Sequence, residues 1–201
     1  MATKYRLLAG SKKRIKQNVI MKTVEEKLKI WSNYLPYNLE TAYCDRFGDI
    51  LKVGMLNNIQ YNESETHPLR LSIEGLYELE HEWMFKPFLW SMDMLTKEIE
   101  HKGERFIPLI KLYNEEVVLF NAKKRNAKIE CKTIKTAHNE FDYSLFIDDK
   151  MVFKFATYGG QEVGSFFQKN IFITNPFYKY QKLLEWHFNI FGLDESEYIK
   201  K

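Results

Sequence analysis

The densest group of side chains that could do chemistry lies between residues 78 and 82, where Glu78, Glu80 and Glu82 alternate, with His81 between the last two. On a β-strand the three carboxylates would share one face and His81 would point to the other, because successive side chains alternate between faces. Three carboxylates on one face bind a hard cation when another segment supplies further oxygen ligands. A solvated strand edge explains the same spacing and is the favoured interpretation, so we predict no metal site and no cofactor.

The histidines and cysteines form no recognisable catalytic pair in the sequence. No two of the five histidines have the spacing of metal ligands on one helix face. Cys44 and Cys131 lie far apart with no neighbouring histidine, so a Cys–His pair could assemble only through the fold. Two such cysteines are typical of reduced thiols in a cytosolic protein rather than of a disulfide framework. His187 falls on an apolar helical stripe, a position that favours a packed core histidine over a catalyst.

Sequence motifs of nucleotide binding and hydrolysis are missing. The chain contains no GxxxxGK(S/T), GxSxG or HExxH, and no GxGxxG after a strand. Gly159, Gly160 and Gly164 resemble a phosphate loop superficially, but neither the lysine nor the following helix is present, which favours a hairpin or bulge. We therefore predict no catalytic residue and favour a non-enzymatic role. An enzyme built on the 78–82 cluster or on a folded Cys–His pair stays open as an alternative.

Basic side chains gather at the beginning of the chain and in one internal cluster. The whole chain carries a net charge of +3, but its first 20 residues carry +6 and contain no acid, which leaves −3 for the rest. Basic clusters bind nucleic acids by neutralising their phosphates. The candidate nucleic-acid-binding residues are Lys12, Lys13, Arg14 and Lys16 of the first cluster and Lys123, Lys124 and Arg125 of the second, which extends to Lys128. Because a mildly acidic body repels phosphates, a protein partner is favoured over nucleic acid.

Residues 1–20 form a basic N-terminal extension, for which three interpretations stay open. The segment is a solvated, disordered or leader segment ahead of a start at Met21, a structural extension packed on the body, or an arm that binds nucleic acid. We take residues 21–201 as a single α+β domain, because the length suits one domain and no linker or internal repeat divides the chain.

The composition excludes several classes of protein. With 45% hydrophobic and 15% aromatic residues, the chain is too apolar for bulk disorder. No apolar run approaches the roughly 18 residues of a membrane span, and the apolar stretch of a secretory signal is missing. We therefore predict a cytoplasmic protein without a membrane partner. The sequence leaves the choice between a monomer and a homo-oligomer open.

Three segments carry helical patterns. Thr23 and Glu26 form a capping box ahead of a helix over 24–34, which stops before Pro36. A second helix is expected from about residue 91 to residue 102, since Gly103 suits the position after a helix. The third is a C-terminal amphipathic helix near 176–191. The residues predicted to have structural roles in the first and third helices are Trp31, Leu184, Trp186, His187, Phe188 and Phe191.

Strands are expected in groups rather than singly between helices. The segments with β character are 39–44, 50–61, 69–79, 129–134, 141–147 and 151–155. Turns are predicted at Asn57-Asn58 and at Asp148-Asp149-Lys150, and Gly75 would interrupt the third segment. Grouped strands favour an α+β fold, with mainly antiparallel sheets packed with about three helices.

Several segments between residues 34 and 193 carry a resemblance to a known family. They are YLPYNL at 34–39, KPFL at 86–89, MLTKEIE at 94–100, GERFIP at 103–108 and LEWHFNIFGL at 184–193. This set resembles a family of small uncharacterised proteins of phages and prophages of Bacteroidetes-type bacteria, whose members share YLPY, KPILRPLSDLTKEI and EWHFDVFGL segments. The chain departs from that pattern at 90–94, where WSMDM stands in place of RPLSD, and its residues 1–20 are extra. The resemblance implies a phage or mobile-element origin and the bacterial host cytoplasm, and it carries no known activity or catalytic residue.

The leading hypothesis is a non-enzymatic phage accessory protein that acts by binding a host or phage macromolecule. It depends on the missing catalytic motifs, the small aromatic-rich body and the resemblance. The first alternative is a nucleic-acid-binding protein that uses the basic N-terminal arm. The second is an enzyme with an unrecognised site.

Overall fold

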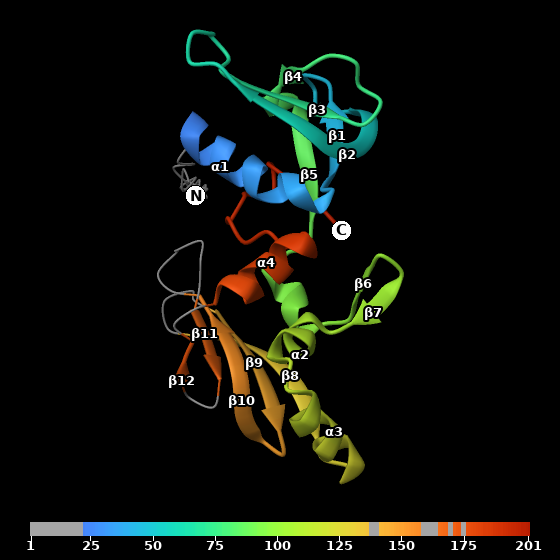
Figure 1. Cartoon of the computed structure of the whole chain (residues 1–201), viewed down its shortest axis with the longest axis vertical. Helices are drawn as coiled ribbons and strands as arrows, with labels where there is room; N and C mark the ends of the chain where they lie inside the picture. The colour runs from blue at the N-terminus through green and yellow to red at the C-terminus, as the bar shows by residue number, and fades with distance from the viewer. Residues whose placement is uncertain (1–21, 137–140, 158–164, 169–170, 174–175) are drawn as a thin grey trace, which may run out of the picture.

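The computed structural model describes residues 22–136, 141–157, 165–168, 171–173 and 176–201, which form an elongated molecule with two large sheets along its long axis (Figure 1). Within these ranges the chain has four α-helices, two large sheets and one two-stranded hairpin. Among the described strand pairs only β13–β5 is parallel. The predicted α+β fold with mainly antiparallel sheets is therefore confirmed, with one α-helix more than expected.

The first large sheet, here the upper sheet, combines segments from distant parts of the chain. Its strands are β1 (Glu40–Cys44), β2 (Ile50–Tyr61), β3 (Leu69–Ile73), β4 (Glu80–His81), β5 (Phe85–Leu89) and β13 (Ile199–Lys200). They lie in the order β13-β5-β1-β2-β3-β4. The turn predicted at Asn57-Asn58 is wrong: β2 passes through both residues with a bulge between Leu56 and Asn58. Pairing with β3 on either side of the bulge overrides the local turn preference.

Helix α1 (Val24–Tyr34) packs against the upper sheet (Figure 1). Its predicted capping box is present, since the Glu26 amide donates to Thr23 Oγ1 at 3.2 Å and the Thr23 amide donates to the Glu26 carboxylate at 2.7 Å. The chain then enters a 3-10 turn, η1 (Leu35–Tyr37), so the helix ends before Pro36 as predicted. The buried side chains of α1 are Ile30, Trp31 and Tyr34.

The helix predicted for residues 91–102 is wrong. The chain forms a short 3-10 helix, η3 (Met92–Thr96), and then a hairpin of β6 (Ile99–His101) with β7 (Glu104–Phe106). Lys102 and Gly103 both have positive φ, 52° and 79°, which suits a two-residue hairpin turn. Gly103 is therefore a turn residue and not a helix stop.

Two short helices follow the hairpin, α2 (Pro108–Tyr113) and α3 (Glu116–Lys124). The sequence predicts no helix here and shows a basic stretch from Lys123 to Lys128. In the structure α3 continues to Lys124, so the first two lysines of that stretch belong to a helix. α3 lies at one end of the molecule (Figure 1).

The second large sheet, here the lower sheet, follows the chain order. Its strands are β8 (Ile129–Lys135), β9 (Phe141–Ile147), β10 (Lys150–Ala156), β11 (Ser165–Gln168) and β12 (Ile171–Phe172). The predicted hairpin of β9 with β10 is confirmed, and its turn residues Asp148 and Asp149 have φ of 49° and 60°. The glycines of the loop that superficially resembles a phosphate site, Gly159, Gly160 and Gly164, lie outside the described residues.

The C-terminal helix α4 (Phe177–Glu185) is shorter than the predicted 176–191. It ends because His187 adopts a positive φ of 61° and the chain then pairs with Trp90. The Trp90 amide donates to the His187 carbonyl and the Asn189 amide donates to the Trp90 carbonyl, both at 2.9 Å. The six residues predicted to be structural are all buried: Trp31, Leu184, Trp186, His187, Phe188 and Phe191. Helical spacing thus located the buried side chains but not the end of the helix.

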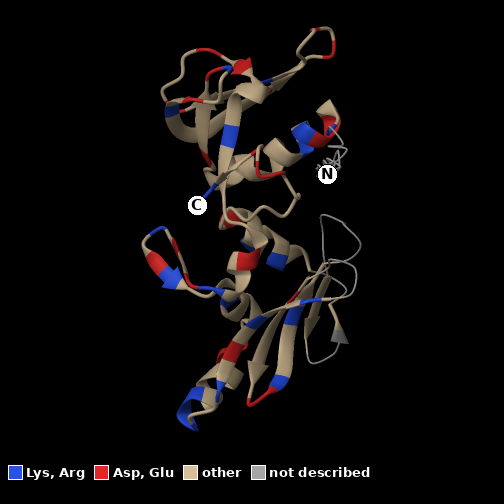
Figure 2. Ribbon diagram, turned by 180° about the vertical axis from the view of Figure 1, so that it is seen from behind, with Lys and Arg blue, Asp and Glu red and all other residues tan. Residues whose placement is uncertain are grey.

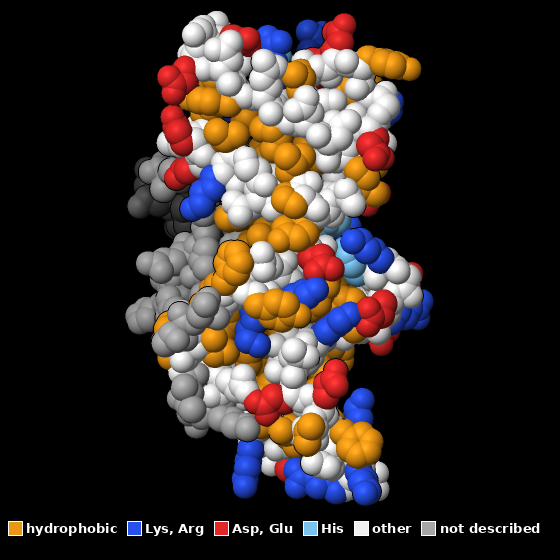
Figure 3. All heavy atoms as spheres, in the orientation of Figure 1, with side chains coloured by type: hydrophobic (Ala, Val, Ile, Leu, Met, Phe, Trp, Pro, Cys, Tyr) orange, Lys and Arg blue, Asp and Glu red, His pale blue; other side chains and the backbone are white. Residues whose placement is uncertain are grey.

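A continuous cluster of buried apolar side chains links the two large sheets through α4 and the segment after it. Tyr34 of α1 meets Phe191 edge to face at 5.7 Å, and Trp186 meets Phe106 of β7 at 4.9 Å between ring centroids. Figure 3 shows one face of the molecule, where apolar side chains also reach the surface in several places beside charged ones. In the described part of the chain, no helix has the length and apolarity that crossing a membrane requires.

Candidate binding groove

A pocket of about 180 Å³ opens beside α1 at the margin of the upper sheet. One wall is α1, with Lys27, Ile30 and Trp31. The other walls are η2 (Glu82–Met84), which leads into β5, and the loop around Leu193 and Glu197. The pocket therefore depends on three segments that are far apart in the sequence.

A second pocket, of about 360 Å³, adjoins the first. It lies between the beginning of α1 and the loop that precedes β3, which contributes His67 and Pro68. Lys27, Glu82 and Trp83 line both pockets and so divide them. We call the two pockets together the Trp83 groove.

Trp83 is the aromatic side chain that the two pockets share, and it is 50% exposed. Its ring stacks with that of His81 at 6.2 Å and an interplanar angle of 13°, and His81 in turn contacts His67 at 4.5 Å between ring centroids. These three rings form a partly exposed aromatic surface at the edge of the sheet. A large apolar ring held in this way is typical of binding surfaces, since burying it on contact removes much apolar area from water.

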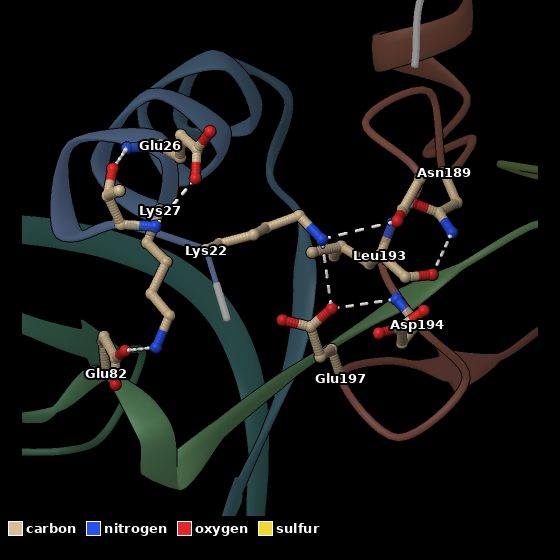
Figure 4. A network of polar contacts seen from close by, with 10 residues as sticks. Lys22, Glu26, Lys27, Glu82, Asn189, Leu193, Asp194 and Glu197 are labelled. Atoms are coloured by element: carbon tan, nitrogen blue, oxygen red, sulfur yellow. Dashed lines mark hydrogen bonds and ion pairs between the residues drawn. The ribbon is translucent and has the colours of Figure 1, made fainter. Parts of the chain in front are cut away.

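Two ion pairs tie α1 and the residues just before it to the walls of the groove (Figure 4). Lys27 pairs with Glu82, and Lys22 pairs with Glu197 at 3.2 Å and also reaches the Gly192 carbonyl at 3.4 Å. The Glu197 carboxylate accepts a further hydrogen bond from the Asp194 amide at 2.9 Å. Both carboxylates of the groove are thus neutralised by lysines of the α1 region, and the apolar and aromatic parts of the lining remain for a ligand.

His187 lies away from this groove, where the two large sheets join. Its Nε2 donates to the Tyr37 carbonyl at 3.0 Å, so Nδ1 has no proton and accepts from the Lys201 ammonium at 3.0 Å. The pKa of His187 is lowered to about 4, mainly by burial and also by the nearby Lys201, while the hydrogen bond to Tyr37 raises it. The imidazole is therefore neutral at pH 7, with both nitrogens hydrogen-bonded. His101, at 5.3 Å between ring centroids, has a pKa lowered mainly by burial.

Neither cysteine is activated as a nucleophile. Cys44 and Cys131 are both free thiols, as predicted. Burial raises the pKa of Cys44 and raises that of Cys131 to about 11, so both are protonated at neutral pH. Because the thiolate is the reactive form, these environments disfavour nucleophilic chemistry.

The carboxylates of residues 78–82 do not converge. Glu78 is exposed, Glu80 lies on β4, and Glu82 begins η2 and pairs with Lys27. Since β4 has only two residues, the three carboxylates do not share one strand face. Searched over the described residues, the structure contains no group of three or more His, Cys, Asp or Glu side chains that could hold a metal ion.

Of the two basic clusters, only the second lies among the described residues. Lys12, Lys13, Arg14 and Lys16 lie outside the described residues. Lys123 and Lys124 are exposed in the last turn of α3, at one end of the molecule (Figure 2). Arg125 pairs with Asp148 at 2.9 Å, and Lys128 pairs with Glu130 at 2.8 Å and with Asp149 at 3.4 Å. The hairpin turn between β9 and β10 thus neutralises half of the second cluster.

Sequence reasoning missed Trp83 and its neighbours Lys27 and Glu82 as members of one site. The available signal was a tryptophan directly after the polar run Glu80-His81-Glu82, where a core residue is less expected than a surface aromatic. No sequence pattern connects it to Lys27 or to the loop at Glu197. No protein-family model, no curated protein and no solved structure matches this chain.

Proposed function

We propose that this protein is a non-enzymatic binding protein, a phage accessory protein by its resemblance, which captures an uncharged apolar segment of a partner protein in the Trp83 groove. The observation that carries the proposal is the half-exposed Trp83 ring between two pockets. Tryptophan is enriched among the residues that dominate binding energy at protein interfaces.

The size of the pockets supports side chains as the occupants. The first pocket, of about 180 Å³, is smaller than small-molecule and cofactor sites, and the second, of about 360 Å³, lies near the lower end of their range. An extended peptide that crosses Trp83 would place one apolar side chain in the first pocket and another in the second.

The ion pairs of the groove support an uncharged segment, although Lys86, which lines the first pocket, has no ion pair among the described residues. Glu82 and Glu197 already have lysine partners from the α1 region. A charged ligand side chain would have to compete with these ion pairs and lose its own hydration, whereas an apolar side chain gains by leaving water.

A capture experiment with matched variants tests the proposal. The full chain, Trp83→Ala and Tyr77→Ala would be immobilised and exposed to lysate of a Bacteroidetes host, and the retained proteins compared. Tyr77 is a fully exposed aromatic residue that lines neither pocket, so it controls for loss of a surface ring. We expect a protein retained by the full chain and by Tyr77→Ala but reduced at least tenfold with Trp83→Ala. Equal retention by all three, or no specific retention, contradicts the proposal.

Nucleic acid is the second candidate partner, favoured by one feature of α3. Phe120 and Lys124 lie one turn apart and are both exposed, with Lys123 beside them, which suits stacking on a base next to phosphate contacts. Binding of the full chain to labelled single-stranded DNA across a salt series tests this alternative. Affinity that falls steeply with salt and drops in the Lys123→Ala/Lys124→Ala variant supports it, and no binding at about 50 mM salt excludes it.

A further inference from the structure

The outward side chains of β2 change character along the strand. Leu51, Val53 and Met55 are 60%, 44% and 37% exposed. Val53 and Met55 share one face of the upper sheet, and Leu51 is the bulged residue beside them, where the pairing of β2 with β1 shifts register. Beyond the bulge in its pairing with β3, the exposed residues of the same strand are polar and include Asn58 and Gln60. The second half of β2 is therefore an ordinary solvated strand, and the first half presents an apolar stripe to water.

On the opposite face of the same half of β2, the side chains contact other parts of the chain. Lys52 and Leu56 point to that face; Leu56 is buried in the core, and the Lys52 ammonium donates to the Gly75 carbonyl. The stripe is therefore not the face of β2 that packs into the core. An antiparallel sheet with one solvated face normally places polar side chains there, so an apolar stripe points to a contact.

The hairpin turn at the beginning of β2 lengthens the apolar surface. Ile50, the first residue of β2, and Phe47, in the turn before it, are both more than half exposed. The stripe and this turn together hold five of the large apolar side chains that are exposed in the described part of the chain. Exposed apolar residues scattered singly are normal, but a contiguous group marks an interaction site.

Charges of both signs flank the stripe on the same face. In the register of the sheet Glu40 lies opposite Met55, and Lys86 lies beside Ala42, which is opposite Val53. Residues directly opposite each other share a face. Among the described residues the Glu40 carboxylate pairs with Lys201 at 3.9 Å, and Lys86, which also lines the first pocket, has no ion pair. A face with one carboxylate and one ammonium beside an apolar centre is complementary to a copy of itself.

We infer that the stripe of Leu51, Val53 and Met55 is the interface through which a second copy of this chain packs sheet against sheet. A two-fold axis parallel to the sheets would bring the two stripes together and set Glu40 of each copy near Lys86 of the other. Such an interface is isologous, so the dimer closes and does not grow into a filament. The inference does not rest on the proposed function. The two surfaces share Lys86, which lines the first pocket of the Trp83 groove, but Leu51, Val53 and Met55 line neither pocket.

Sedimentation velocity of the full chain from about 1 to 100 µM tests the interface. We expect a reversible monomer–dimer equilibrium in this range, and monomer throughout for Val53→Asp, because a buried unpaired carboxylate opposes association. Leu51→Asp repeats the test at the most exposed position of the stripe, where folding is least affected. Gln60→Asp is the matched control, since it adds the same charge to an exposed position of the same strand and should leave the dimer intact.

Each outcome decides the inference. A full chain that is monomeric at every concentration overturns it, and this is also the result expected if another protein or residues 1–21 cover the stripe. A dimer that persists unchanged in both Leu51→Asp and Val53→Asp places the interface elsewhere and overturns it as well. A dissociation constant raised at least tenfold in both variants but not in Gln60→Asp supports it. Circular dichroism of each variant confirms that the fold is retained.

Discussion

The two large sheets differ in how far apart in the sequence their partners lie. In the lower sheet, ion pairs join near neighbours, such as Lys154 with Asp142 across the β9–β10 hairpin. Around the upper sheet, Lys27 reaches Glu82 over 55 residues and the Lys22–Glu197 pair spans 175. The strands follow the same division, because β8 to β12 lie in chain order while β13 joins β5 from far along the chain.

This difference locates the candidate binding surfaces. The Trp83 groove and the β2 stripe both belong to the upper sheet, where elements from distant parts of the chain meet. Segments that meet over long separations need not fill every space between them or cover both faces of a sheet. A hairpin of consecutive strands, in contrast, pairs most of its side chains with its own neighbours.

The largest expected effect is at the joint between the two sheets. Phe188 is fully buried there, so Phe188→Ala should lower the free energy of unfolding by about 3–5 kcal/mol, the usual cost of a cavity of this size. Leu184→Ala, on α4, should cost about 2–5 kcal/mol for the same reason. Urea denaturation measures both. Phe172→Ala, at an exposed position of the lower sheet, is the control and should change stability by less than about 1 kcal/mol. If Phe188→Ala behaves like Phe172→Ala, the joint does not hold the sheets together.

The second effect is a loss of stability in acid. The pKa of His187 is about 4 in the folded chain and near 6.5 in the unfolded chain, so the unfolded state binds a proton first as the pH falls. Stability should therefore fall between pH 6.5 and pH 4, by on the order of 3 kcal/mol from this residue. Denaturation at pH 7, 5.5 and 4.5 measures the slope.

His187→Gln should flatten that slope, because glutamine does not titrate. His101 adds a smaller effect of the same sign, and Lys102 and Lys201 are the cations that disfavour protonation of both rings. A slope that is identical in the full chain and in His187→Gln would assign the acid sensitivity to other groups.

The smallest effect compares one ion pair from each region. A double-mutant cycle on Lys27 and Glu82 should give a coupling energy of about 1 kcal/mol, because their side chains are only 29% and 12% exposed. The same cycle on Arg125 and Asp148, which are 63% and 45% exposed, should give less than about 0.5 kcal/mol. Equal couplings would show that the long-range pair contributes no more to stability than the surface pair.

Features that depend on neighbouring residues could be predicted from the sequence. The capping box at Thr23 needs only Glu26, three residues on, and the β9–β10 hairpin needs only two runs around Asp148-Asp149. The prediction was wrong where a helix and a hairpin are both consistent with the same spacing of apolar residues. Leu95 and Ile99 suit a helix face, yet both are buried from η3 and β6, because Gly103 closes a hairpin.

The candidate surfaces could not be predicted, because they depend on long-range placement. The sequence shows part of the alternation of β2 but does not reveal which face α1 covers, so the exposure of Val53 was not foreseeable. Trp83, Lys27 and Glu197 come from three separate segments, and no spacing relates them. For His187 the sequence predicted a packed core histidine, but the bond to Lys201 requires the pairing of β13 with β5.

The parallel pairing of β13 with β5 has a consequence for synthesis of the chain on the ribosome. The lower sheet is complete once Phe172 has left the exit tunnel, since all its strands are then available. The upper sheet begins earlier, with strands that end at Leu89, yet it gains its edge strand only with Ile199 and Lys200. The region translated first is therefore finished last, and during that interval the edge of β5 stays open to chaperones and to other nascent chains.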